Sequence, residues 1–165
     1  LSWETLEGVT TVIPCKLEYN TATNGFSLIG YHSANETFHY YSLDTLPTVT
    51  VGNVPVEIDA NALYKEYQET NRQTVLFSIY DLNNAIDRCF NAFCNYEIIG
   101  SETEPNTFTL SVEYLPFQEK DIVRILLSLG AAIRVQEPSI IKDQLNTIYT
   151  KAISMLGKEP VNDQL

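Results

Sequence analysis

The clearest hydrophobic pattern in the chain lies between Leu115 and Pro138. Its apolar residues first follow the spacing of three and four that gives a helix one apolar face. Gly130 then suits the left-handed residue that ends a helix, and the alternation of apolar and polar residues at 133–136 predicts a strand. The segment therefore predicts a helix that turns tightly back onto a sheet. The helix face comprises Ile122, Ile125, Leu126 and Leu129.

Strand and helix patterns also alternate along the rest of the chain from residue 74 onward. Residues 74–80 form a continuous apolar strand, and Asp81 and Pro138 suit the starts of two further helices. The predicted order is strand, helix, strand, strand, helix, strand, helix. With right-handed crossovers this order gives an antiparallel sheet with its helices on one face, the ferredoxin-like arrangement. The middle strands are predicted at 96–99 and 108–114 with a polar turn at 102–106, and the stripe of the first helix comprises Leu82, Ala85, Ile86, Cys89, Phe90 and Phe93.

The first part of the chain has a different pattern, in which short apolar runs are separated by turn residues. Such a series of short strands predicts a small SH3-like or Sm-like β-barrel. A short helix capped by Asp59 and a polar linker follow it. We therefore expect an α+β chain with a barrel at 1–58, a helix and linker at 59–73, a ferredoxin-like domain at 74–157 and a polar tail at 158–165. The barrel strands are predicted at 11–19, 26–32, 38–43 and 48–51.

Composition and charge narrow the classes of protein to which the chain can belong. With 165 residues and 44% hydrophobic content it has the composition of a globular protein. The net charge of −11 opposes the wrapping of duplex DNA. Three cysteines fit reduced thiols better than a disulfide framework, and we expect a cytoplasmic protein. Because the sequence begins at Leu1 and in the middle of a strand pattern, we read it as a piece of a longer protein.

Several stretches of the sequence resemble one family. IPCKLEYNTATNGFSLIGY and YSLDTLPTV resemble the second half of a WYL domain, a barrel found in bacterial transcription regulators. NNAIDRCFNAFCNYE and DIVRILLSLGAAIRVQEP resemble the C-terminal extension that follows that domain, so the resemblance runs from Val12 to Leu156. It implies a region that senses an effector and assembles subunits. It also implies that duplex DNA is bound only through a helix-turn-helix upstream of this sequence.

The resemblance also implies a ligand, which in such barrels is a nucleotide or a single strand of nucleic acid. At the place of the family's Trp-Tyr-Leu triplet this chain has Phe26-Ser27-Leu28. At the place of a ligand-facing arginine it has Thr45, which removes a bidentate phosphate donor. A different ligand, or a module without any ligand, is therefore a second interpretation.

Eight residues are candidate ligand contacts. Histidines and aromatic rings on a barrel face can stack on a base, with a lysine as phosphate donor. The alternative is that the aromatic rings fill the barrel core and the histidines face water. Arg88 matches a charged pair in the family's extension and can bind a ligand, a neighbouring subunit or merely a surface acid. The candidates are Lys16, Phe26, Ser27, His32, His39, Tyr41, Thr45 and Arg88.

Catalytic and metal-binding motifs are not found in the sequence. There is no nucleophile elbow, phosphate loop or paired Cys-x-x-Cys, so we expect neither an enzyme nor a metal or other cofactor. A small hydrolase of the acylphosphatase type is the enzymatic alternative. The strand edges of a four-stranded sheet, together with 10 tyrosines and 7 phenylalanines, lead us to expect a homodimer.

Overall fold

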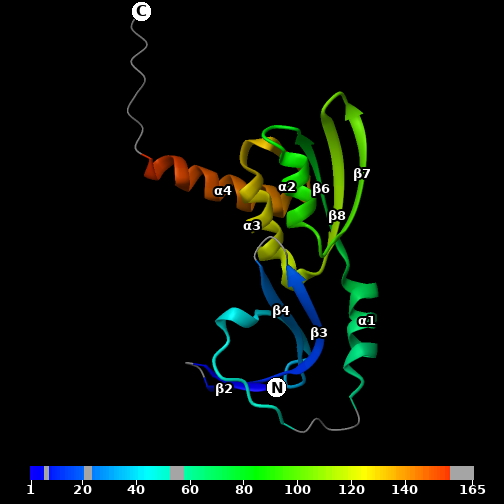
Figure 1. The fold of residues 1–165 in the computed structure, drawn as a ribbon, viewed down its shortest axis with the longest axis vertical. Helices are drawn as coiled ribbons and strands as arrows, with labels where there is room; N and C mark the ends of the chain where they lie inside the picture. Colours follow the sequence, from blue (N-terminus) through cyan, green and yellow to red (C-terminus); the bar gives the residue numbers. More distant parts are fainter. Residues whose placement is uncertain (6–7, 21–23, 53–57, 157–165) are drawn as a thin grey trace, which may run out of the picture.

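The computed structural model describes residues 1–5, 8–20, 24–52 and 58–156, whose strands form three antiparallel sheets. The first module, drawn in blue and cyan in Figure 1, holds a two-stranded and a three-stranded sheet. The second module, green to red, holds a four-stranded sheet and three α-helices. The elements of the first module are β1 (Ser2–Thr5), β2 (Gly8–Thr11), β3 (Ile13–Asn20), β4 (Gly25–His32), β5 (Thr37–Ser42) and the 3₁₀ turn η1 (Leu43–Thr45).

The three-stranded sheet β3-β4-β5 has two faces of different character. Because side chains alternate across a strand, Ile29 and Tyr31 of β4 share one face with Phe38 of β5. All three are buried in one cluster. The opposite face carries Leu28, which is buried in a smaller cluster with Val12.

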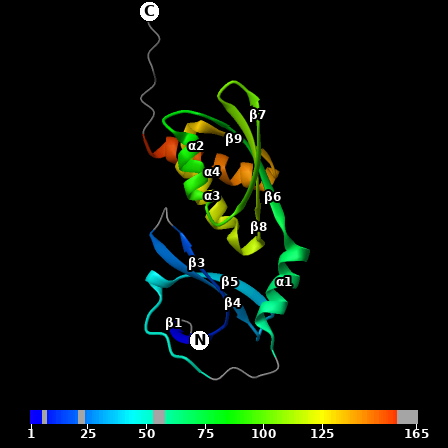
Figure 2. The same ribbon diagram turned by 45° about the vertical axis from the view of Figure 1, so that its right-hand side comes forward.

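Helix α1 (Ala60–Asn71) connects the two modules and packs against the first sheet. The Asp59 side chain caps it by accepting hydrogen bonds from the backbone amides of Asn61 and Ala62, both at 3.1 Å. Tyr64 is buried beside Phe38, with 5.6 Å between ring centroids. The helix leads almost directly into β6, the first strand of the second module (Figures 1 and 2).

The second module has the strand order β7-β8-β6-β9, with every neighbouring pair antiparallel. Its core contains Phe77 of β6, Phe93 of the α2 end, Leu126 of α3 and Ile141 of α4, each fully buried. Helices and sheet therefore share one continuous core. The elements are β6 (Gln73–Tyr80), α2 (Ala85–Ala92), β7 (Glu97–Glu104), β8 (Thr107–Tyr114), η2 (Pro116–Gln118), α3 (Glu119–Leu129), η3 (Gly130–Ala132), β9 (Ile133–Glu137) and α4 (Ser139–Met155).

The segment with the clearest sequence pattern folds as predicted. Helix α3 buries the predicted apolar face, Gly130 follows it with a positive φ of 61°, and β9 begins at Ile133. The start of α4 next to Pro138 also agrees with the sequence, since Pro138 is the residue before the first helical one. Local pattern and tertiary packing agree in this part of the chain.

Four predictions about individual elements were wrong. Asp81 does not cap α2, because Asn83 and Asn84 take left-handed conformations and delay the helix to Ala85. Leu82 therefore precedes the helix and is 52% exposed, and Phe90, also predicted in the apolar stripe, lies within the helix but is 50% exposed. The strand expected at 48–51 is reduced to a single bridge between Ser2 and Thr50, and the turn expected at 102–106 is mostly the end of β7.

The predicted polar tail at 158–165 lies outside the described residues. Within the described part of the chain, no helix is long and apolar enough to cross a membrane.

Candidate functional site

The two modules contact each other through a short segment that follows β8. Leu115 and Phe117 belong in sequence to the second module, but their side chains pack into the core of the first sheet. Leu115 is 4% exposed, and the Phe117 ring stacks on Tyr67 of α1 at 6.1 Å. The Gln118 side chain fixes this segment by accepting a 2.8 Å hydrogen bond from the Leu115 amide. The first module is therefore completed by residues of the second.

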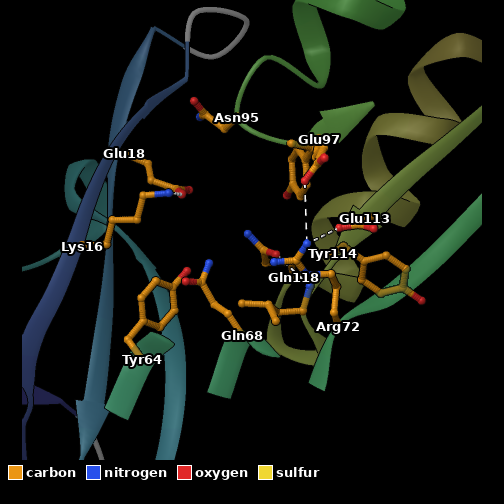
Figure 3. A pocket seen from close by; sticks show the side chains of 12 residues that line it. Lys16, Glu18, Tyr64, Gln68, Arg72, Asn95, Glu97, Glu113, Tyr114 and Gln118 are labelled. Carbon is orange, nitrogen blue, oxygen red and sulfur yellow. Dashed lines mark hydrogen bonds and ion pairs between the residues drawn. The ribbon is translucent and has the colours of Figure 1, made fainter. Parts of the chain in front are cut away.

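A cavity of about 110 Å³ lies on the α1 side of this junction (Figure 3). We call it the Arg72 cavity. Lys16 and Glu18 project into it from β3, and Tyr64 and Gln68 line it from α1 (Figure 3). Arg72 lines it from the end of α1, and the second module supplies the remaining lining residues, which include Asn95, Tyr96, Glu97, Glu113 and Gln118.

The charged groups of the Arg72 cavity are paired with one another. The Arg72 guanidinium contacts Glu113 at 2.6 Å and Glu97 at 3.7 Å, as the dashed lines in Figure 3 show. Lys16 contacts Glu18 at 2.7 Å, and the Glu18 side chain is only 5% exposed. A carboxylate buried to this degree requires a charged partner, because its desolvation is costly. These pairs support the junction and leave little charge for a ligand.

A larger cavity of about 430 Å³ lies between the first sheet and the N-terminal turn of α3. We call it the Tyr40 cavity. The first module lines it with hydroxyl groups and one carboxylate, and the second with one aromatic ring and three charged groups of α3. Its size is within the range of about 300–1,000 Å³ that is usual for small-molecule sites. The lining residues are Gly25, Ser27, Tyr40, Ser42 and Asp44, and across from them Phe117, Lys120, Asp121 and Arg124.

The charges in the Tyr40 cavity are only partly paired. Asp121 accepts a 2.9 Å hydrogen bond from the Tyr96 hydroxyl and contacts Arg124 one helical turn later. Burial, together with the charge of Asp121, holds the pKa of Tyr96 far above its usual range. Lys120 and Asp44 form no ion pair with another residue that the structure describes.

The Tyr40 hydroxyl is a hydrogen-bond donor at neutral pH. Burial raises its pKa above the ordinary value of 10.0, against the opposing effect of a hydrogen bond with Ser27. The nearby carboxylates of Asp121 and Glu18 raise the pKa further. Tyr40 and Ser27 therefore present neutral polar groups to the cavity, beside the charges of α3.

Two of the eight candidate residues line these cavities. Ser27 lies in the Tyr40 cavity and Lys16 in the Arg72 cavity. Both are on the face of the first sheet that is directed toward the second module, because they have the same strand parity as Ile29. The structure places them in different cavities.

Three further candidates lie together on the opposite face of the same sheet. The rings of His32 and His39 are 4.8 Å apart, and His32 Nε2 contacts the Tyr41 hydroxyl. Burial lowers the pKa of His32, and the charge of His39 lowers it further. This cluster has the opposite strand parity to Ser27 and Tyr40, so it cannot contact a ligand in the Tyr40 cavity.

The remaining candidates are dispersed. Phe26 is 47% exposed and packs on Tyr19 with 4.9 Å between ring centroids. The Thr45 hydroxyl donates to the Ser42 carbonyl at 2.9 Å, which is a local turn contact. Arg88 is exposed on α2 and lines neither cavity. The eight candidates therefore do not form one site.

The sequence interpretation missed most of the Tyr40 cavity. Tyr40 and Asp44 follow β4 closely, whereas Lys120, Asp121 and Arg124 come from a helix that is distant in sequence. Asp121 and Arg124 have the i,i+3 spacing of an ordinary ion pair within one helix. The concentration of charged residues in this turn of the helix could have suggested a binding site. No local sequence pattern, however, indicates which surface the turn will face.

Metal and thiol chemistry have little structural support in the described part of the chain. It contains no cluster of three or more His, Cys, Asp or Glu side chains able to hold a metal ion. The cysteines are free thiols, and burial raises the pKa of Cys89 to about 12, which keeps that thiol protonated.

The chain matches no protein-family model and none of the curated proteins compared with it. Among solved structures it is similar to proteasome accessory factor B/C (PafBC) of Arthrobacter aurescens, at 15% sequence identity and a TM-score of 0.37. The match covers 87% of this chain but only 23% of PafBC, so the chain spans less than a quarter of that protein. A similarity at this identity and TM-score does not establish a shared function.

Proposed function

We propose that this chain is the effector-sensing and assembly region of a transcription regulator, and that a small polar ligand binds in the Tyr40 cavity. The observation that carries the proposal is that both modules line this cavity. A ligand there contacts the first sheet and α3 at once, so its binding favours one arrangement of the modules over others. A change of arrangement at this junction is a means of transmitting a signal to attached domains.

Two further observations support this assignment. The sequence from Val12 to Leu156 resembles the sensing part of WYL regulators. Of the Phe26-Ser27-Leu28 triplet, which stands at the place of the family's Trp-Tyr-Leu, Ser27 lines the Tyr40 cavity. The strand order β7-β8-β6-β9 supports the expected ferredoxin-like βαββαβ unit, to which α4 is added at the end. We propose that this unit forms the homodimer.

Calorimetric titration of the chain against nucleotides, short single-stranded DNA and RNA, and small metabolites tests the binding proposal. We expect saturable binding of at least one small compound. Arg124→Ala should weaken that binding about tenfold, because Asp121 loses its ionic partner and its uncompensated carboxylate then lies beside that of Asp44 in the cavity. Arg88→Ala is the matched control, since Arg88 is an exposed helical arginine that lines neither cavity.

Failure of every compound to bind would contradict the proposal, as would equal effects of the two arginine variants. Binding of single-stranded nucleic acid with no dependence on Arg124 would place the ligand on another surface. That result would also reject the Tyr40 cavity as the sensing site.

A pure interaction module without a ligand is the second candidate function. The observation that favours it is the end of α4, where Ile153, Met155 and Leu156 are 53%, 78% and 84% exposed. Helix α4 extends away from the module in Figure 1, and only its first half is buried against the sheet. Light scattering separates the two functions, since a tight dimer that Ile153→Glu dissociates, together with no ligand binding, would favour the second.

A further inference from the structure

The charges that line the Tyr40 cavity sum to zero, although the chain as a whole carries −11. Lys120 and Arg124 are positive, and Asp44 and Asp121 are negative. A ligand that leaves water for this site meets both signs of charge in a space of about 430 Å³. The cavity therefore favours a ligand without net charge.

Pairing within the cavity leaves one charge of each sign available. Asp121 already accepts from Tyr96 and contacts Arg124, so this pair is satisfied by the protein. Lys120 and Asp44 are both exposed and have no ionic partner among the described residues. In the Arg72 cavity, by contrast, Lys16 and Arg72 both have carboxylate partners.

The two available charges come from different modules. Asp44 belongs to η1 of the first module, and Lys120 belongs to α3 of the second. A ligand that pairs with both therefore needs a negative group and a positive group on one small molecule. Such a ligand would connect the two modules by charge, and not only by filling space.

Resting on the binding role proposed above, we infer that the ligand of the Tyr40 cavity is a zwitterion of the α-amino acid class, with its carboxylate toward Lys120 and its ammonium group toward Asp44. The hydroxyls of Tyr40, Ser27 and Ser42 add neutral hydrogen bonds to the same ligand. Phe117 contributes the one purely hydrocarbon side chain among the lining residues. It favours a ligand with a neutral side chain.

The same charges disfavour polyphosphate ligands. A nucleoside triphosphate brings several negative charges, and it would have to approach a chain of net charge −11. The cavity offers Lys120 and Arg124 against Asp44 and Asp121, which leaves no net positive charge for the phosphates. A zwitterion avoids this repulsion because it is neutral overall.

Titration with leucine, phenylalanine and two matched analogues of leucine tests this inference. 3-Methylbutylamine lacks the carboxylate, and 4-methylpentanoate lacks the ammonium group. We expect leucine or phenylalanine to bind, and each analogue to bind at least tenfold more weakly than leucine. This difference corresponds to the loss of one charged contact.

Two variants of the chain assign each charge to its partner. Lys120→Gln should weaken amino acid binding and remove the preference for leucine over the amine. Asp44→Asn should weaken binding and remove the preference for leucine over the acid. Lys65→Gln and Asp87→Asn are the matched controls, since both residues are exposed and line neither cavity. Denaturant unfolding of each variant verifies that the chain remains folded.

The outcomes distinguish this inference from the proposed function. Binding of a nucleotide or another non-zwitterionic compound that depends on Arg124, without amino acid binding, would overturn the inference and leave the sensing role in place. Equal affinity for leucine and both analogues would overturn it as well. Absence of binding by every compound of both panels would overturn both proposals.

Discussion

The two modules differ in how they complete their cores. The second module closes its core with its own sheet and helices, so that Phe77, Phe93 and Ile122 are fully buried by local neighbours. The first module buries Ile29 and Phe38 only with help from α1 and from Leu115, which follows the last residue of β8. The second module is self-sufficient, whereas the first depends on the junction. A change at the junction should therefore affect the first module more than the second.

The largest loss of stability is expected from a mutation in the core of the second module. Phe77→Ala removes a fully buried ring from the centre of β6 and should lower the free energy of unfolding by about 3–5 kcal/mol. Phe26→Ala removes the same side chain from the first sheet, where it is 47% exposed, and should cost about 1 kcal/mol or less. Denaturant unfolding of both variants measures the difference. Similar losses for the two would show that Phe26 is covered in solution.

A sharper test of the comparison uses two leucines of matched burial. Leu115 is 4% exposed in the junction, and Leu145 is 5% exposed in the second core. Each change to alanine should cost about 2–5 kcal/mol. Hydrogen exchange should nevertheless differ, because Leu115→Ala opens β3, β4 and β5 while β6 and β8 stay protected. If Leu145→Ala opens the first sheet equally, the modules unfold as one unit and the proposed dependence is incorrect.

The same difference explains how much of the fold the sequence predicted. In the segment from Leu115 to Pro138 the apolar spacing, Gly130 and the following alternation all describe contacts that are close in the chain, and the structure agrees. The first module was predicted less well because Leu115 and Tyr64, which bury its sheet, lie far away in sequence. The strand at 48–51 was wrong since its pairing reduces to one bridge with Ser2.

The candidate site was less predictable than the fold. Ser27 was identified from a family resemblance, and the structure places it in the Tyr40 cavity. His39 and Tyr41 were grouped with it, but neighbouring residues of a strand point to opposite faces. Sequence reasoning could not assign Lys120 and Asp121 to a cavity, because the cavity exists only after α3 has packed against the first sheet. Strand parity was the signal that would have excluded the histidines.

A smaller effect, of opposite sign, is expected at the end of β8. The Tyr114 hydroxyl is buried and has no hydrogen-bond partner among the described residues. Tyr114→Phe should therefore stabilise the chain by about 1 kcal/mol, because an unsatisfied buried hydroxyl is removed. Tyr96→Phe is the matched control and should destabilise, since the Tyr96 hydroxyl donates to Asp121. Thermal unfolding measures both, and a loss of stability in Tyr114→Phe would indicate a bound water at that hydroxyl.

The smallest expected effect on stability is the pH dependence due to His32, on the outer face of the first sheet, which is the face opposite to Ser27 and Tyr40. Burial lowers the pKa of His32 below the ordinary 6.5, so the folded chain binds this proton less readily than the unfolded chain. The contribution to stability is complete above the unfolded pKa and is lost as the pH falls through about 6.5 toward the folded pKa. His32→Gln should flatten this part of the pH dependence. Unfolding free energies at about pH 7.5 and about pH 5.5 give the slope.

His39→Gln separates the two causes of the shift at His32. Because burial is a larger cause than the charge of His39, this variant should keep most of the slope that His32→Gln removes. Equal slopes in the unmodified chain and in His32→Gln would show that His32 is as well solvated in the folded chain as in the unfolded one. The outer face of the first sheet would then be open to water, and its dependence on the second module would be limited to the face that Leu115 covers.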